Sequence, residues 1–267
     1  MKYKLIASDI DGTLLKDDKS ISPRTLSAIK TALEQGAVFV VSSGRSVLFC
    51  DYFEKLTGLR DIPFILYNGA RILTGPSHDV TFRQELCPSD ALWLVNAGIK
   101  AKTTVIVWTN DTLYVNELNS RTQRYKTLAL TEPVVFTDPE EVTKNGASKV
   151  LWFDETDRAS YLQDILNSGP IRDHINYFTS DPRFMEIVDR NCSKALALDK
   201  LCKMYGIKKE ETIAFGDGYN DLPMIEWAGL GVAMANAPAE IKERADRVTL
   251  SNEEDGVAAV IEELVLC

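Results

Sequence analysis

Short apolar runs that end in a polar turn and lead into a helix-like segment recur near the start of the chain, and this rhythm limits the possible folds most strongly. The three apolar runs lie at residues 4–8, 37–41 and 63–67. Helical patterns follow the first two, at 23–35 and 46–57, and the first of these has Ser22 as expected N-cap and Gly36 as its stop. Strands that alternate with helices predict an α/β domain with a parallel sheet.

The rhythm changes in the middle of the chain and returns near its end. Over residues 85–189 the pattern is that of an α+β unit, with helices at 89–97 and 157–167 and strands at 104–109, 112–115, 149–153, 175–179 and 183–188. Strands and helices alternate again afterwards. The helices are expected at 193–205, 220–227, 238–244 and 256–264, and the strands at 212–215, 231–233 and 247–249. We therefore expect residues 1–84 and 190–267 to form one domain, with 85–189 inserted into it.

Composition excludes several classes of protein. Apolar residues make up 45% of the chain and charged residues 26%, which is enough for a packed core. The formal charge of −9 disfavours nucleic acid as a partner. Five scattered cysteines without a CxxC pair disfavour a disulfide framework and a zinc ribbon. No stretch approaches the roughly 18 apolar residues of a membrane span, so a cytoplasmic location is expected. The oligomeric state is not predicted.

Two aspartates, Asp9 and Asp11, directly follow the first apolar run, at the carboxyl end of a predicted buried strand. A bend eased by Gly12 would aim both carboxylates into one crevice at the edge of the sheet. One carboxylate can attack a phosphorus atom while the other gives a proton to the leaving oxygen and then activates water. An ordinary Asp/Gly turn after a strand is the alternative interpretation.

A second acid cluster, Asp217 with Asn220 and Asp221, follows the apolar run at 212–215. The same rule places it at the same edge of the sheet, so that Asp217 can join Asp9 around a cation. A hard ion such as Mg²⁺ prefers oxygen ligands and few carboxylates, which fits an all-aspartate site. The alternative is a helix N-cap formed by Asn220 or a neighbouring turn residue.

Two further segments carry candidate phosphate ligands. Ser43-Gly44-Arg45 lies where a strand meets a helix, so that its hydroxyl and nearby backbone N–H groups could hold a phosphoryl oxygen. Ser43 could equally be a helix N-cap. Lys194 begins the helix after the inserted segment, where a cation opposes the helix dipole unless something anionic faces it. A solvated surface lysine is the alternative.

The joint pattern is more specific than any of its parts, because the acid pair, the serine, the lysine and the second acid cluster all lie at predicted ends of strands and helices. On this pattern the chain resembles the haloacid dehalogenase superfamily, and within it the Cof-type sugar-phosphatase-like hydrolases, over essentially its whole length. The motifs that carry the resemblance are Asp9-Ile10-Asp11-Gly12-Thr13, Ser43-Gly44-Arg45, Asn68-Gly69-Ala70, Ser193-Lys194 and Gly216-Asp217 with Asn220-Asp221.

This resemblance implies a magnesium-dependent phosphatase that forms an aspartyl-phosphate and acts on small phosphorylated metabolites. The resemblance implies Asp9 as nucleophile and Asp11 as general acid/base. It implies phosphate or substrate binding by Ser43, Gly44, Lys194 and Asn220. The implied Mg²⁺ ligands are Asp9, Asp217 and the backbone carbonyl of Asp11, and the implied supporting residues are Asp221, Thr13 and Arg45. Substrates implied by the resemblance are sugar phosphates, pyridoxal phosphate and flavin mononucleotide.

The resemblance also implies a Rossmann-like core domain and an inserted α+β cap of type IIB, which closes over the site and supplies most substrate contacts. One departure is that the usual Lys-Gly start of the helix reads Lys194-Ala195 here. This loses a glycine that would let phosphate approach closely, and we expect a local adjustment.

Two other functions share parts of the pattern. A phosphomutase of the phosphomannomutase type resembles the chain in acid pair and cap, but returns the phosphoryl group to the sugar. A non-catalytic metabolite sensor is the other alternative, but a protein that only binds its ligand would not need the complete set of reactive residues. Outside the motifs, His78 and His174 are expected to be structural or surface residues. Trp93, Trp108 and Trp152 fall in the cap and are expected to fill its core rather than line a pocket.

Overall fold

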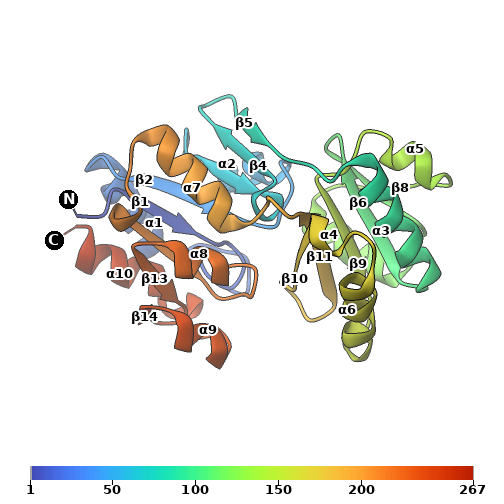
Figure 1. The fold of residues 1–267 in the computed structure, drawn as a ribbon. Coiled ribbons are helices and arrows are strands. Elements are labelled where there is room, and N and C mark those ends of the chain that lie inside the picture. Colours follow the sequence, from blue (N-terminus) through green and yellow to red (C-terminus); the bar gives the residue numbers. More distant parts are fainter. Residues whose placement is uncertain (1, 267) are drawn as a thin grey trace. The chain divides into compact units, whose positions relative to one another are not determined.

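A computed structural model describes residues 2–266, which form two compact units (Figure 1). The first unit consists of Met1–Ser43, Cys50–Phe82 and Ser193–Cys267. The second consists of Gly44–Phe49 and Arg83–Cys192. Each unit contains one of the two sheets of the structure.

The sheet of the first unit has the strand order β14-β13-β12-β1-β2-β3-β4-β5. Its strands are β1 Leu5–Ser8, β2 Val38–Ser42, β3 Phe64–Leu66, β4 Arg71–Thr74, β5 Asp79–Arg83, β12 Thr212–Gly216, β13 Leu230–Ala233 and β14 Arg247–Val248. All neighbouring pairs from β14 to β3 are parallel, and β4 pairs with β3 antiparallel. The predicted α/β fold with a parallel sheet is confirmed.

The helices of the first unit come from the segments before and after the inserted stretch. They are α1 Pro23–Glu34, α2 Phe49–Thr57, α7 Lys194–Tyr205, α8 Leu222–Trp227, α9 Ala239–Arg244 and α10 Gly256–Leu264, with short 3-10 turns at Tyr67–Gly69, Lys209–Glu211 and Asn252–Glu254. Ser22 caps α1 as predicted, because its side chain accepts a hydrogen bond from the backbone N–H of Thr25. Apolar side chains of α7 and α8 pack on one sheet face, against a set that includes Leu5, Ala7 and Val40.

The sheet of the second unit has the order β10-β11-β9-β6-β7-β8. Its strands are β6 Thr104–Thr109, β7 Thr112–Val115, β8 Val134–Val135, β9 Lys149–Phe153, β10 Ile175–Phe178 and β11 Phe184–Asp189. Its helices are α3 Pro88–Lys100, α4 Ser120–Ala129, α5 Pro139–Thr143 and α6 Ala159–Ser168, with 3-10 turns at Thr156–Arg158 and Arg172–His174. All pairs are antiparallel except β7 with β8, so the predicted α+β character is confirmed.

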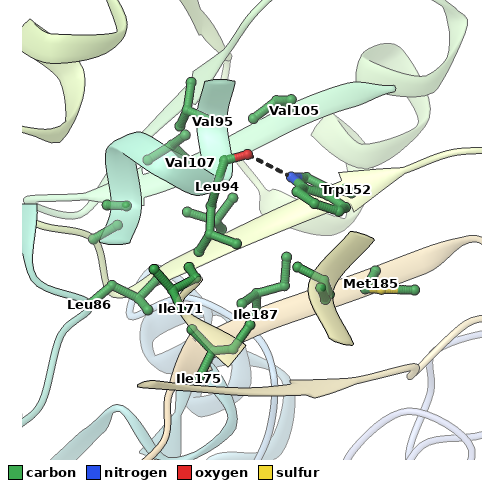
Figure 2. Packing of buried hydrophobic residues seen from close by; sticks show 14 of the residues in the cluster. Leu86, Leu94, Val95, Val105, Val107, Trp152, Ile171, Ile175, Met185 and Ile187 are labelled. Carbon is green, nitrogen blue, oxygen red and sulfur yellow. Dashed lines mark hydrogen bonds between the residues drawn. The ribbon is translucent and has the colours of Figure 1, made fainter. Parts of the chain in front are cut away.

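Buried aliphatic side chains of α3, β6, β9 and β11 form the core of the second unit around Trp152 (Figure 2). The indole N–H of Trp152 donates to the Leu94 carbonyl at 3.2 Å, which satisfies the one polar group of a fully buried ring. Trp93 packs against this core, and Trp108 is buried with its N–H donating to the Tyr125 hydroxyl at 3.0 Å. The three tryptophans therefore fill space within the second unit, as predicted.

The helix α4 was not predicted, because only three of its ten residues are apolar and they form no marked stripe. Local capping supports it instead: the Asn119 side chain accepts hydrogen bonds from the backbone N–H groups of Arg121 and Thr122. Across residues 2–266 the longest helix, α3, has 13 residues, and no helix has the length and apolar character that a membrane crossing needs.

Candidate active site

Four strands of the first unit deliver candidate site residues to one edge of the sheet. Ser8 at the end of β1 lies opposite Phe215 of β12 and Val41 of β2. Because these strands are parallel, the residues that follow them emerge at the same edge. The backbone N–H of Asp9 donates to the Phe215 carbonyl at 3.0 Å, and that of Ser43 donates to the Ile65 carbonyl of β3 at 2.8 Å. The register therefore brings the predicted segments together.

Three carboxylates meet at this edge. Asp9, Asp217 and Asp221 each offer an oxygen, and these oxygens all lie within 4.8 Å of one another. Asp9 and Asp221 are buried, and Asp217 is half-buried. Three acids held so closely repel one another, so the arrangement requires a compensating positive charge.

Lys194 supplies one such charge. Its side chain is fully buried, and its ammonium donates to Oδ1 of Asp9 at 2.5 Å and to Oδ1 of Asp221. Burial by itself would lower the pKa of Lys194, but the carboxylates of Asp221 and Asp9 raise it above its ordinary value. Lys194 is the first residue of α7, and it therefore has the anionic partners that a cation at this end of a helix requires. Ser193 caps the same helix, because its hydroxyl accepts a hydrogen bond from the backbone N–H of Leu196.

The Asp221 carboxylate is oriented by the turn that precedes α8. Its Oδ2 accepts hydrogen bonds from the backbone N–H of Asp217 at 3.1 Å and of Gly218 at 2.9 Å. Its Oδ1 accepts from Lys194, so both oxygens have donors. Sequence reasoning assigned Asp221 only a supporting role, although an Asp that closes a Gly-rich turn by bonding back to the main chain is a known local pattern.

The electrostatics of the cluster favour protons on the acids. Burial, followed by repulsion from Asp221, raises the pKa of Asp9 well above its ordinary value, and Lys194 only partly offsets this. Burial and the Asp221 charge raise the pKa of Asp217 to about 7, against the lowering effect of a hydrogen bond from Thr13. That bond runs from Thr13 Oγ1 to Asp217 Oδ1 at 2.8 Å. A divalent cation would replace these protons, so the residues fit a metal site with oxygen ligands.

Gly12 fits closely against the cluster. Its φ is +81°, and a Cβ at this position would collide with the Asp217 carboxylate, so the bend after β1 requires glycine. The carbonyl of Gly12 accepts a hydrogen bond from the Asn236 side chain at 2.8 Å. Asn236 was not predicted, and it stands in no motif that would have marked it.

Asp11 projects toward solvent more than Asp9 does. Its carboxylate accepts a hydrogen bond from the Lys19 ammonium at 2.9 Å, and the side chain is 38% exposed. Lys19 was missed in the sequence because a lysine in a polar turn resembles any surface lysine. An accessible acid two residues beyond a buried one is compatible with proton transfer to a bound molecule.

Ser43 and Asn220 are both buried at the same edge, and neither caps a helix. The next helices begin only at Phe49 and Leu222, and the Asn220 amide donates to Oδ1 of Asn68 at 3.1 Å. Asn68 belongs to one of the motifs that carry the family resemblance, but the resemblance implies no role for it.

Gly44 and Arg45 belong to the second unit. The Gly44 carbonyl accepts a hydrogen bond from Lys149, whose ammonium also forms a buried ion pair with Glu186 at 2.6 Å. The Arg45 guanidinium lies over the Phe49 ring at 4.5 Å.

Both histidines lie away from the carboxylate cluster, as predicted. His78 contacts Glu54 at 3.1 Å and packs edge-on against the Phe64 ring. His174 contacts Asp90 at 3.1 Å and has a largely exposed side chain.

Comparison with known proteins identifies the family. The family model of haloacid dehalogenase-like hydrolases matches residues 6–261. The chain belongs to this family. A 5-amino-6-(5-phospho-D-ribitylamino)uracil phosphatase of Bacillus subtilis, YitU, is 33% identical, over 98% of this chain and 97% of the relative. The crystal structure of a haloacid dehalogenase-like hydrolase from Bacteroides thetaiotaomicron is 31% identical with a TM-score of 0.86, over 98% and 99% of the two chains.

A third match bears on the fold alone. The sugar phosphatase BT4131, of subclass IIB, superposes with a TM-score of 0.86 at 23% identity and covers 99% of this chain and 100% of its own. The fold of this chain, with its inserted unit, is therefore that of the subclass IIB structure. The family resemblance seen in the motifs is confirmed by the family model and by the relative YitU, which match nearly the whole chain. This hydrolase is a phosphatase, a phosphoric monoester hydrolase, and its relatives act on different small phosphorylated metabolites.

Proposed function

We propose that this phosphatase transfers the phosphoryl group of a small phosphate monoester to Asp9 and then to water, with Mg²⁺ as cofactor. The observation that carries the proposal is the position of Asp9. Its carboxylate is buried at the end of β1, contacts the Lys194 ammonium, and lies within 4.8 Å of two more carboxylates that can share a cation. A structural turn would gain nothing from such a costly collection of charges.

Magnesium fits the donor set. Carboxylate oxygens are the ligands that Mg²⁺ prefers, and no cysteine or histidine joins the cluster among the described residues. Asp9 and Asp217 would hold the ion together with the Asp11 carbonyl. Bound there, it would offset negative charge on the phosphoryl oxygens. Lys194 would do the same from within the protein.

The residues of the chain divide the reaction into two steps. In the first, a carboxylate oxygen of Asp9 forms a bond to phosphorus while the ester P–O bond breaks, and Asp11 gives its proton to the departing oxygen. In the second, water attacks the phosphorus of the aspartyl-phosphate and gives a proton to Asp11. The bond between phosphorus and the Asp9 oxygen breaks, which releases phosphate and restores the Asp9 carboxylate. Ser43, Lys194 and Asn220 would hold the phosphoryl oxygens during both steps.

The second unit is proposed to be the cap that recognises the non-phosphate part of the substrate. The names of the relatives point to a phosphorylated ribityl compound in one case and to sugar phosphates in another. Sugar phosphates are the proposed substrates, with flavin mononucleotide and pyridoxal phosphate as further candidates. The phosphate-binding residues are common to all of these, so only the cap can distinguish them.

A panel of phosphate esters tests this proposal. We expect magnesium-dependent release of inorganic phosphate from sugar phosphates and phosphoribityl compounds, with a broad profile of kcat/KM and no release after chelation. The measurement is a phosphate assay run beside chromatography of the organic product. An isomeric sugar phosphate without net phosphate release would instead identify a phosphomutase. Tight binding of a phosphate ester without any turnover would identify a sensor.

Magnesium affinity should depend on pH because of Asp217. Its pKa is about 7 in the folded metal-free protein, against an ordinary value of 3.8. Asp217 therefore binds more protons in the folded state than in the unfolded chain between these pH values, so its contribution to the stability of the metal-free protein falls as pH rises from about 4 to 7. A cation must displace this proton. We expect Mg²⁺ affinity to rise at least about tenfold per pH unit up to about pH 7, because the raised pKa of Asp9 adds a second proton that the ion must displace.

Titration calorimetry from about pH 5.5 to 8 measures this dependence, and buffers with different ionisation enthalpies count the released protons. Asp217→Asn is the informative variant, since it should weaken binding and flatten the pH dependence. An affinity for Mg²⁺ that is unchanged between about pH 5.5 and 7 would contradict the assignment of Asp217 to the metal site.

A further inference from the structure

The turn Tyr67–Gly69 has an unusual backbone for its place in the fold. It directly follows β3, and its residues have φ values of 52°, 54° and 99°. A left-handed conformation costs about 1 kcal/mol or more at a residue other than glycine. All three residues are buried, and the side chain of Asn68 has no exposed surface. The surrounding structure must therefore hold this turn in place.

Asn68 connects two segments of the site. Its backbone N–H donates to the Ser43 carbonyl at 3.1 Å, and its side-chain Oδ1 accepts from the Asn220 amide at 3.1 Å. Asn220 lies 152 residues further along the chain. Both partners are buried, so water competes little for these hydrogen bonds and each favours one geometry.

Gly69 joins a third segment to the same turn. A Cβ on Gly69 would collide with the carbonyl of Ser193, so the two backbones are in direct contact. Ser193 immediately precedes Lys194 and caps α7. The turn thus touches the chain beside Lys194 as well as Ser43 and Asn220. These are the three residues proposed to hold the phosphoryl oxygens, and all contacts lie within the first unit.

We infer that Asn68 is a positioning residue for phosphate recognition, which acts by fixing Asn220 relative to Ser43. The left-handed turn directs the side-chain oxygen of Asn68 toward the Asn220 amide, while the backbone N–H of Asn68 donates to the Ser43 carbonyl. The inference rests on the proposed roles of Ser43 and Asn220 in binding phosphate. Displacement of a binding group by about 1 Å is enough to cost up to about 100-fold in rate, so a lost hydrogen bond here should be measurable.

Asn68→Gly is the first variant, because glycine adopts the same backbone without strain and removes only the side chain. We expect kcat/KM to fall about 10- to 100-fold, with KM and the inhibition constant of inorganic phosphate raised about tenfold. The unfolding midpoint should change much less. Asn110→Gly is the matched control, since Asn110 also has a positive φ (48°) but lies exposed in the β6–β7 turn.

A double-mutant cycle separates positioning from general damage. In the wild-type background, Asn220→Ala should weaken phosphate binding. In the Asn68→Gly background the same change should cost little, because Asn220 is already unrestrained. Asn68→Asp keeps the acceptor oxygen and tolerates the backbone, so in that background Asn220→Ala should again be costly. The charge that Asn68→Asp adds is present in both members of that comparison and cancels. If the glycine variant does not fold, Asn68→Ala, which also lacks the acceptor oxygen, takes its place in the cycle.

The outcomes distinguish two kinds of failure. If Ser43→Ala and Asn220→Ala both leave the phosphate inhibition constant unchanged, the proposed roles of these residues are wrong whatever Asn68 does. If both raise it, but Asn220→Ala is equally costly in the wild-type and Asn68→Gly backgrounds, the positioning role of Asn68 is overturned. If Asn220→Ala weakens phosphate binding only when residue 68 carries an acceptor oxygen, the positioning role of Asn68 is supported.

Discussion

Replacement of Asp9 by asparagine is expected to lower kcat by at least about 10⁴-fold, because an amide cannot form the aspartyl-phosphate. The fold should survive, since the amide has the same shape and its oxygen can still accept a hydrogen bond from Lys194. Burial and the neighbouring acids raise the pKa of Asp9, which means that the charged form is disfavoured in the folded metal-free protein. A neutral side chain should therefore leave the melting temperature of the metal-free protein equal to or above that of the wild type.

Steady-state kinetics and thermal unfolding test this expectation. Asp18→Asn is the matched control, because Asp18 is an exposed acid of the loop that follows the same strand and lies outside the carboxylate cluster. Mass spectrometry of rapidly quenched wild-type enzyme should locate the phosphoryl group on the peptide that contains Asp9. Near-native turnover by Asp9→Asn, or a phosphoryl group on another peptide, would show that Asp9 is not the nucleophile.

Replacement of Lys194 by methionine should damage both stability and activity. The ammonium is fully buried between Asp9 and Asp221, so its removal leaves closely spaced carboxylates without their cation. Loss of one partner from a buried ion pair typically costs about 3 to 5 kcal/mol of folding free energy. The phosphoryl oxygens also lose a positive group, which should lower kcat about 10²- to 10³-fold.

Magnesium separates the two effects of this substitution. The ion should restore much of the lost stability of Lys194→Met, because it places positive charge among the same carboxylates, but it should not restore turnover. Thermal unfolding with and without Mg²⁺, together with kcat, measures both. Lys203→Met is the matched control on α7, with a side chain that is 74% exposed in its pair with Asp199. Wild-type stability of metal-free Lys194→Met, combined with near-native kcat, would refute the assignment.

The sheet edge that holds the site was predictable from local sequence. Apolar runs that end in Asp9, Ser43 and Asp217 show where buried strands stop. The handedness and parallel pairing of such strands then place their carboxyl ends together. Ser22 as the N-cap of α1 was predictable for the same kind of reason, since one side chain serves backbone groups a few residues away.

Contacts between distant segments were not predictable in this way. The pairing of Lys194 with Asp221 depends on how α7 meets the turn before α8, and sequence spacing carries no information about that approach. The helix α4 was missed because its few apolar residues give no amphipathic stripe, while its capping by Asn119 resembles an ordinary polar turn.

By itself, the sequence determined the family, the α/β character and the strand ends that carry the acids, because these depend on short motifs and local periodicity. Only the tertiary structure decided how charge is balanced within the site. It brought Lys194 between Asp9 and Asp221, and it placed Asn68 between Ser43 and Asn220. Such contacts depend on strand register and on the packing of helices against the sheet, which the whole chain sets together.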